Sequence, residues 1–139
     1  MIEETSAGIV LFRKEESKIL FLLLHYPSGH WDFVKGKMEK RESTHQTAIR
    51  EAKEETGITD ITFIENFEEW IEYNFKHQGE LVQKKVVFFL AETKTKEVKI
   101  SHEHSGYTWL DYNSSMEKTT FDNAKTVLTK AEKLLSDTL

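Results

Sequence analysis

Apolar positions near the N-terminus fall in two runs that are rich in β-forming residues. Ala7–Arg13 and Ile19–His25 are separated by the polar stretch Lys14–Ser17, which has the length of a hairpin loop. The second run is apolar at consecutive positions rather than at alternate ones, as is typical of a strand that is covered on both faces. We therefore expect two paired strands in a sheet with structure packed on each side.

The middle and the end of the chain carry helical patterns. Tyr26–Arg41 has the composition of a loop, whereas Glu42–Thr56 has helical periodicity and stops at Gly57, a residue type that often ends helices in a left-handed conformation. Near the C-terminus, apolar residues recur with the spacing of one helix face, at Phe121, Ala124, Val127, Leu128, Ala131, Leu134 and Leu135. Two helices are therefore predicted, and the second is amphipathic.

The segment between these helices is rich in β-forming residues. Strands are predicted near Ile61–Tyr73 and Leu81–Thr93, joined by the polar turn Lys76–Glu80, and a short strand is predicted at Tyr107–Leu110. The polar loop Ser101–Ser105 precedes the short strand. Two strands, a helix, further strands and a second helix predict an α/β (α+β) fold, an α/β/α sandwich with a mixed β-sheet between helices.

Length and composition indicate one soluble domain. The 139 residues contain no repeat or linker, so residues 1–139 are predicted to form a single domain. The net charge of −5 argues against duplex nucleic acid as the main partner, and the absence of cysteine excludes disulfides, a thiolate nucleophile and a Cys-ligated zinc site. Neither a signal peptide nor a membrane span of ~20 apolar residues is evident. We expect a cytoplasmic protein without a membrane partner.

Three glutamates of the first predicted helix share one of its faces, which we call the acidic face. Glu51, Glu54 and Glu55 stand at i, i+3 and i+4, and like charges at these spacings destabilise a helix by roughly 0.2–0.5 kcal/mol per pair. Clustered carboxylate oxygens are the ligands of hard divalent cations such as Mg²⁺. A solvent-exposed acidic helix face has the same spacing of glutamates, so the cluster alone does not distinguish it from a metal site. The residues around the acidic face are needed to choose between these two interpretations.

A wider pattern surrounds the acidic face. The seven fixed positions of G-x5-E-x7-R-E-U-x-E-E-x-G-U are filled by Gly36, Glu42, Arg50, Glu51, Glu54, Glu55 and Gly57, with Ala52 and Ile58 at the two apolar positions. Chance fills all seven with a probability on the order of 10⁻⁸ per start position. The chain therefore resembles the Nudix family, and a merely solvated face is rejected.

The resemblance implies a metal site and a reaction. In Nudix enzymes the glutamates of the acidic face bind Mg²⁺ or Mn²⁺, and water attacks a phosphorus atom of a nucleoside diphosphate linked to another group. Gly36 would let the backbone approach the ion, and Arg50 can hold the carboxylates by a charge-assisted bidentate bond. Glu42 is expected at the positive end of the helix dipole. Glu54 is the preferred general base.

Residues outside this pattern resemble one branch of the family, the asymmetric diadenosine tetraphosphate hydrolases, from about Ala7 to Leu135. The likeness is carried by Ile19–Leu24, His30-Trp31, Lys35-Gly36, Ile100–His104, Tyr107 and Trp109-Leu110. It implies that Glu103 is a further metal ligand, or that it takes part in activating water as the rival of Glu54. Read alone, His102 and His104 suit an ordinary polar loop or, less well, a zinc site.

The same resemblance implies substrate contacts. Positions that contact the polyphosphate are matched by His30, Lys35 and one of Lys84 or Lys85, and the aromatic positions that sandwich an adenine ring are matched by Tyr73 and Phe121. Simpler interpretations exist for each of them. The two aromatic residues could belong to the core, the lysines could protect the start of an edge strand, and the histidine could cap a turn.

Two segments depart from the pattern of that branch. Asp32–Val34 stands where prolines are common before the Lys-Gly pair, and Lys37–Arg41 replaces a more usual Glu-Pro-Gly approach to the helix. The implied metal ligands are intact. The entrance to the site, and with it the order of substrate preference, depends on these segments.

These observations predict a monomeric enzyme that binds a small nucleotide and cleaves a dinucleoside polyphosphate, diadenosine tetraphosphate to ATP and AMP, by metal-activated water. Another Nudix substrate is the first alternative: an oxidised nucleoside triphosphate, a capped or triphosphorylated RNA end, or a diphosphoinositol phosphate, which a chain with few arginines disfavours. A non-catalytic nucleotide-binding sensor is the second. Such sensors usually lose carboxylates of the motif, and this chain keeps all of them.

Overall fold

Two long parallel strands form the centre of the molecule in the computed structural model, which describes residues 1–138. They are β1 (Ile2–Glu15) and β7 (Glu80–Glu92), and they pair along most of their length. Every other described strand pairs with one of these two or with β2 (Lys18–His25), so the sheet has eight strands. Because parallel and antiparallel pairs occur in one sheet, the predicted mixed sheet is confirmed.

The remaining strands all pair in the antiparallel direction. β2 carries β3 (Trp31–Asp32) and β8 (Gly106–Leu110), β1 carries β4 (Val34–Lys37), and β7 carries β5 (Thr62–Phe63) and β6 (Glu69–His77). β1 therefore pairs with β4 in its middle, at Ser6–Ile9, and with β2 near its end. This division leaves β4 at the margin of the sheet, where its side chains reach the site described below.

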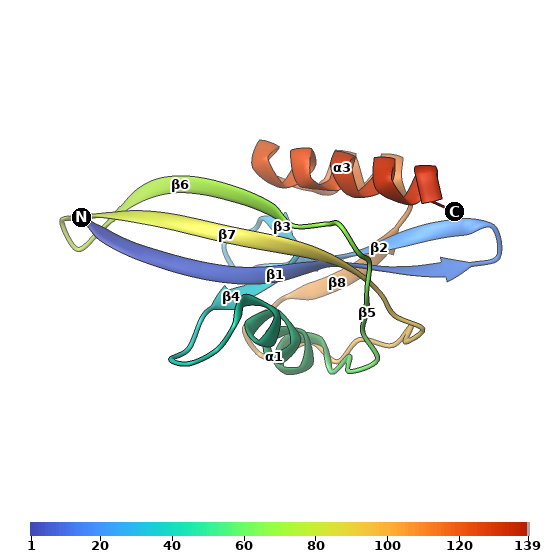
Figure 1. Ribbon diagram of the computed structural model, residues 1–139, viewed down its shortest axis with the longest axis horizontal. Helices are drawn as coiled ribbons and strands as arrows, with labels where there is room; N and C mark the ends of the chain where they lie inside the picture. The colour runs from blue at the N-terminus through green and yellow to red at the C-terminus, as the bar shows by residue number, and fades with distance from the viewer. Residues whose placement is uncertain (139) are drawn as a thin grey trace.

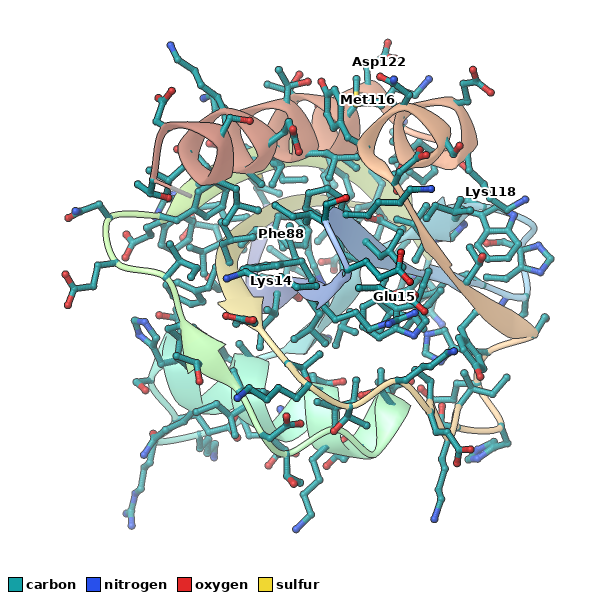
Figure 2. All side chains as sticks on the ribbon, turned by 90° about the vertical axis from the view of Figure 1, so that its right-hand side faces the viewer. Lys14, Glu15, Phe88, Met116, Lys118 and Asp122 are labelled. Atoms are coloured by element: carbon teal, nitrogen blue, oxygen red, sulfur yellow. The ribbon has the colours of Figure 1, made fainter. Side chains whose placement is uncertain are left out.

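Helices cover both faces of the sheet (Figures 1 and 2). α1 (Thr44–Thr56) lies on one face, and α3 (Asp122–Thr138) lies on the other with the short α2 (Tyr112–Lys118) packed against it. The predicted α/β/α arrangement is confirmed. None of the helices within residues 1–138 combines the length and the apolar character that crossing a membrane requires.

The consecutive apolar residues of β2 are explained by the two layers. Phe21 and Leu23 belong to the core beneath α3, whereas Leu22 and Leu24 belong to the core beneath α1. Phe88 of β7 lies in the α3 core, between the sheet and the helical layer in Figure 2. Successive side chains of a strand point to opposite faces, so a strand buried on both faces has no polar alternation.

Both predicted hairpins are present, with tighter turns than expected. β1 and β2 are joined by Glu16 and Ser17 alone. β6 and β7 are joined by Gln78 and Gly79, whose φ angles are 52° and 81°. Two successive residues with positive φ match the right-handed twist of the paired strands, which favours this turn.

α1 begins at Thr44 rather than at the predicted Glu42. The Ser43 hydroxyl accepts a hydrogen bond from the Gln46 backbone N–H at 3.1 Å, and the Gln46 side chain accepts one from the Ser43 N–H at 2.8 Å. This capping box starts the helix at the next residue, so Glu42 lies outside it. Gly57 ends the helix with a φ of 76°, as predicted.

Other predicted boundaries were wrong. The expected loop Tyr26–Arg41 contains β3 and β4, which are too short to show a period of two. The expected strand Ile61–Tyr73 is interrupted between β5 and β6, where Asn66 has a φ of 67°. The seven-residue α2 was not predicted. β1 begins five residues before the expected Ala7, because its pairing with β7 extends to Ile2.

Candidate active site

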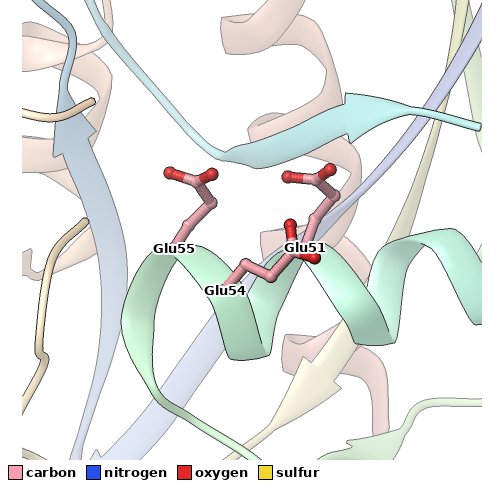
Figure 3. Close-up of side chains that lie close together, drawn as sticks. All are labelled: Glu51, Glu54 and Glu55. Carbon is pink, nitrogen blue, oxygen red and sulfur yellow. The ribbon is translucent and has the colours of Figure 1, made fainter. Parts of the chain in front are cut away.

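α1 brings its three acidic-face carboxylates close together. One side-chain oxygen from each of Glu51, Glu54 and Glu55 lies within 4.8 Å of the others. In Figure 3 all three extend from the same stretch of helix. Glu51 and Glu55 are only 8% and 6% exposed, whereas Glu54 is open to solvent. The spacing in the sequence therefore does produce a compact cluster of oxygen donors.

Gly36 of β4 makes room for this cluster. A Cβ atom at Gly36 would collide with the Glu51 carboxylate. Any other residue would therefore push β4 and α1 apart or displace the carboxylate. The approach of the backbone to an ion at Gly36 stays a prediction, and in this structure the group that lies against Gly36 is the Glu51 carboxylate.

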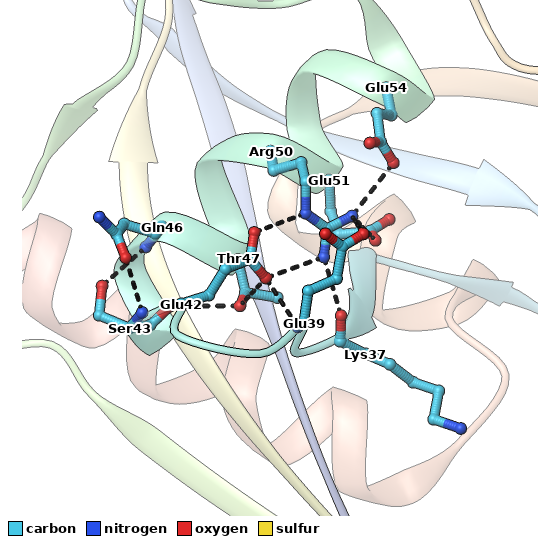
Figure 4. A network of polar contacts seen from close by, with 9 residues as sticks. All are labelled: Lys37, Glu39, Glu42, Ser43, Gln46, Thr47, Arg50, Glu51 and Glu54. Atoms are coloured by element: carbon cyan, nitrogen blue, oxygen red, sulfur yellow. Dashed lines mark hydrogen bonds and ion pairs between the residues drawn. The ribbon is translucent and has the colours of Figure 1, made fainter.

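Arg50 connects the carboxylates in a network that Figure 4 shows. Its guanidinium donates two hydrogen bonds to Glu42, at 2.6 and 3.1 Å, and further bonds to Glu51 at 2.8 Å and Glu54 at 3.2 Å. It also donates to the Lys37 carbonyl at 2.9 Å. Arg50 thus holds two acidic-face carboxylates and the end of β4 in one arrangement, while the bidentate bond that was predicted is made to Glu42.

The expectation that Glu42 lies at the positive end of the helix dipole is wrong. Glu42 takes part in the Arg50 network instead. It precedes the Ser43 cap, and its carboxylate accepts hydrogen bonds from Arg50, from the Glu39 backbone N–H and from the Thr47 hydroxyl. The Arg50 bond, with these further donors, lowers the pKa of Glu42 to about 2. Glu42 therefore remains charged and fixes the guanidinium.

The loop that follows β7 is anchored to the acidic face by buried polar contacts. His104 Nδ1 lies 2.6 Å from Glu55 Oε2, and the Ser101 hydroxyl donates to the same oxygen at 2.8 Å. The Ser101 backbone N–H also donates to the Glu55 carbonyl at 3.3 Å. His104 is buried with its Nδ1 at Glu55 while His102 is exposed, so the zinc alternative is not supported.

These elements surround a cavity of 560 Å³, which we call the acidic cavity. Its lining includes the acidic face, Arg50, Glu103 and the β4 residues Lys35, Gly36 and Lys37. Burial raises the pKa of Glu51, as do the charges of Glu55 and Glu54, against the opposing bonds from Arg50. A divalent cation would offset this repulsion, so the donor set fits a hard ion with oxygen ligands.

A second cavity, of 440 Å³, contains the expected aromatic pair and is called the aromatic cavity. Tyr73 of β6 and Phe121, just before α3, both line it, together with His30 and Lys35. The two aromatic side chains are 36% and 49% exposed, so the interpretation that they belong to the core is wrong. Lys35 lines both cavities, so the two adjoin.

His30 is held between aromatic rings at the edge of the aromatic cavity. Tyr26 stacks on it with centroids 4.6 Å apart, and the Phe121 ring lies 5.1 Å away at a tilt. Ser28 Oγ lies 2.6 Å from His30 Nδ1, and burial lowers the pKa of the imidazole. The His30 carbonyl does close a turn, accepting from the Tyr26 N–H at 2.9 Å, and the ring lines the aromatic cavity.

Phe121 reaches His30 because the segment before α3 pairs with β3. The Thr120 N–H donates to the Trp31 carbonyl at 3.1 Å, and the Trp31 N–H donates to the Thr120 hydroxyl at 2.8 Å. The Lys118 ammonium lies 4.4 Å from the Trp31 ring centroid. These contacts join segments that are far apart in the chain.

Lys84 and Lys85 occupy opposite faces of the sheet. β7 pairs with both β1 and β6, so the interpretation that these lysines protect an edge strand is wrong. Lys84 pairs with Tyr73 in register, on the face of the aromatic cavity, and lies 3.4 Å from the Glu4 carboxylate. Burial lowers the pKa of Lys84. Lys85 points to the other face, so Lys84 is the lysine that accompanies the predicted site.

Reasoning from the sequence missed several of the lining residues, among them three in the segment Tyr26–Arg41. Tyr26 and Lys37 line the acidic cavity, and Asp32 lines the aromatic cavity. Lys35 Nζ lies 3.1 Å from Asp32 Oδ2, so one departure from the branch's pattern supplies a buried carboxylate beside this lysine. No periodicity distinguishes these residues, because they lie in the segment that was expected to be a loop.

Similarity to known proteins extends over nearly the whole chain. The NUDIX domain family profile matches residues 3–130. The chain is 32% identical to the bis(5'-nucleosyl)-tetraphosphatase (asymmetrical) of Mus musculus, with 96% of each chain covered, and 34% identical to that of Sus scrofa, with 94% covered. It superposes on a C. elegans Ap4A hydrolase binary complex with a TM-score of 0.82 at 30% identity, covering 96% of this chain and 98% of that one.

Proposed function

The chain belongs to the Nudix family, and we propose that it hydrolyses dinucleoside polyphosphates, cleaving diadenosine tetraphosphate to ATP and AMP. It is a Nudix hydrolase of the asymmetrical bis(5'-nucleosyl)-tetraphosphatase group. The observation that carries the proposal is the junction of two cavities at Lys35, one lined by carboxylates and one by an aromatic pair. A nucleotide needs both environments, one for its phosphates and one for its base.

The acidic face and Glu103 are the proposed ligands for Mg²⁺ or Mn²⁺, with the backbone at Gly36 beside them. Such an ion, when bound, lowers the pKa of the attacking water and neutralises charge on the phosphates. Arg50 holds Glu51 and Glu54, and the Ser101 and His104 contacts hold Glu55. Preorganised carboxylates of this kind bind a cation without further ordering.

Glu54 is the proposed general base. It is the exposed member of the acidic face, and its only described hydrogen bond within residues 1–138 is the 3.2 Å contact from Arg50. Glu51 and Glu55 are buried and more tightly bound. A base has to reach the proton of the attacking water, which an exposed carboxylate at the cavity surface can do. Glu103, exposed at the same cavity, is the rival.

The aromatic cavity is the proposed site of one adenine ring. The ring would lie between Tyr73 and Phe121, since stacking on an aromatic face stabilises a bound base by roughly 1–3 kcal/mol. The phosphates would then pass His30, Lys35 and Lys84 on their way to the acidic cavity. A base fixed at one end sets the attacked phosphorus away from the middle of the chain, which gives unequal products.

Product analysis tests this proposal. The protein is incubated with diadenosine tetraphosphate and Mg²⁺ in ¹⁸O-labelled water, and the products and the position of the label are determined. We expect ATP and AMP in equal amounts, with the label in one of them. Two ADP molecules, or faster turnover of an oxidised nucleoside triphosphate or a triphosphorylated RNA end, would overturn the asymmetric assignment.

A further inference from the structure

A third cavity lies at the free end of the β6–β7 hairpin, and we call it the hairpin cavity. It has a volume of 410 Å³, and its apolar lining consists of Ile2, Phe75 and Val82. Figure 1 shows that this end of the sheet extends beyond α3, next to the N-terminus. The polar part of the lining consists of Glu4, Lys37, His77, Gln78 and Glu80. The cavity is thus an open aromatic and apolar surface with charged groups at its side.

The hairpin cavity adjoins the acidic cavity at Lys37, which lines both. The aromatic cavity adjoins the acidic cavity at Lys35. Side chains two residues apart on a strand share a face and are separated by about 7 Å, so both lysines extend from the same face of β4. The acidic cavity therefore adjoins two other cavities, the aromatic cavity at Lys35 and the hairpin cavity at Lys37. Each of these two cavities has an aromatic side chain in its lining.

The lysines between the cavities outnumber the carboxylates that they contact. Lys37 lies 2.9 Å from Glu4, Lys84 lies 3.4 Å from the same residue, and Lys35 lies 3.1 Å from Asp32. Three cations thus share two carboxylates on this face. A polyphosphate chain passing from one cavity to the other would pass these three lysines, whose positive charges suit its negative charge.

We propose that the hairpin cavity binds the second nucleoside of the dinucleoside polyphosphate, with its base stacked on Phe75. The proposal rests on the proposed function, because only a substrate with two bases needs a second stacking surface. The Phe75 ring is 37% exposed, and its centroid lies 6.2 Å from that of Tyr73, although the two rings line different cavities. A flat base on Phe75 would also cover the neighbouring side chains of Ile2 and Val82.

A pair of ligands that differ by one nucleoside tests the inference. Diadenosine tetraphosphate is the substrate, and adenosine 5'-tetraphosphate, which has the same phosphates and a single base, is used as a competitor. The single base should occupy the two-ring site formed by Tyr73 and Phe121. We expect Phe75→Ala to lower kcat/KM for the substrate by about 5- to 150-fold, as for the loss of one stacked base, and to change the inhibition constant of the competitor by less than about twofold.

Matched variants isolate the flat ring of Phe75. Phe75→Tyr keeps the ring and should behave as the wild type, whereas Phe75→Leu keeps apolar bulk without a ring and should resemble Phe75→Ala. Leu81→Ala removes an exposed apolar side chain from the opposite face of the same hairpin and should change neither constant. Tyr73→Ala should weaken both ligands.

Three results would overturn the inference. Equal weakening of both ligands by Phe75→Ala would mean that Phe75 acts only through Tyr73. Unchanged constants for Phe75→Ala and Phe75→Leu, in a wild-type protein that does cleave diadenosine tetraphosphate, would remove the second-nucleoside site and leave the proposed function standing. A wild-type protein that does not cleave this substrate would overturn the proposed function itself.

Discussion

His104 Nδ1 lies 2.6 Å from Glu55 Oε2, and this buried contact joins the loop that carries Glu103 to the helix that carries the acidic face. The Ser101 hydroxyl reinforces it by donating to the same oxygen. Because Glu103 follows Ser101 by two residues and precedes His104 by one, its backbone is held at both sides. The loop can therefore present an exposed carboxylate at the acidic cavity without losing its attachment.

His104→Ala should lower the free energy of unfolding by about 1.5–3 kcal/mol, because the buried Glu55 carboxylate loses a hydrogen-bond donor. Denaturant unfolding at neutral pH measures this change. His102→Ala is the matched control, since this exposed residue is in the same loop and its replacement should change stability by less than about 0.5 kcal/mol. Equal stability of the two variants would contradict a structural role for the contact.

Glu51→Gln and Glu55→Gln should each remove most activity while the protein remains folded, because each keeps the side-chain volume and removes a metal-binding charge. EDTA should abolish product formation by the wild type. A second readout does not depend on catalysis: Mg²⁺ should raise the melting temperature of the wild type more than that of either variant. Near-normal turnover by both variants would refute the assignment of the acidic face to a metal.

Glu103→Gln should lower kcat by about tenfold or more with little change in KM, the pattern expected when an interaction is made mainly in the transition state. Steady-state kinetics with diadenosine tetraphosphate measures both constants. A metal-bound complex in which Glu103 points into solvent, away from the acidic face, would be incompatible with this role. The same kinetics on Glu54→Gln compares the two candidate bases.

Tyr73→Ala and Phe121→Ala should each weaken productive binding by about 5- to 150-fold, the loss of one base stack, while the dependence of turnover on Mg²⁺ stays unchanged. Trp70→Ala is a suitable control, because Trp70 is 49% exposed on the same strand as Tyr73 but faces the other side of the sheet. A comparable loss in the Trp70 variant would show that exposed aromatic residues of β6 act without a specific site.

Glu42 should make stability depend on pH in the acid range. Its pKa falls from 4.5 to about 2 in the folded protein, chiefly through the Arg50 hydrogen bond. A depressed folded pKa contributes stability that is fully present above the unfolded pKa and is lost as pH falls toward the folded value. Glu42→Gln should therefore be less stable than the wild type at pH 7, and the difference should shrink between pH 4.5 and about 2. A constant difference across this range, in denaturant unfolding, would contradict the linkage.

Local spacing determined the acidic face and the helix that carries it. Glu51, Glu54 and Glu55 stand on one face of any α-helix, and Gly57 ends that helix whatever surrounds it. The β1–β2 and β6–β7 hairpins are likewise local, because each is formed by adjacent strands and a short turn. These features involve residues only a few positions apart, so periodicity and turn chemistry are enough to predict them.

The arrangement of the cavities was decided by contacts between distant segments. β4 pairs with β1, which places Lys35 and Lys37 at the acidic cavity, and Thr120 pairs with Trp31, which brings Phe121 to His30. Strand alternation predicts that Lys84 and Lys85 face opposite ways, but only the register of β7 decides which one joins Tyr73. Register and strand order depend on burial summed over both cores, and that sum includes residues from the whole chain. For this reason the acidic face could be predicted from the sequence, while the groups that surround it needed the tertiary structure.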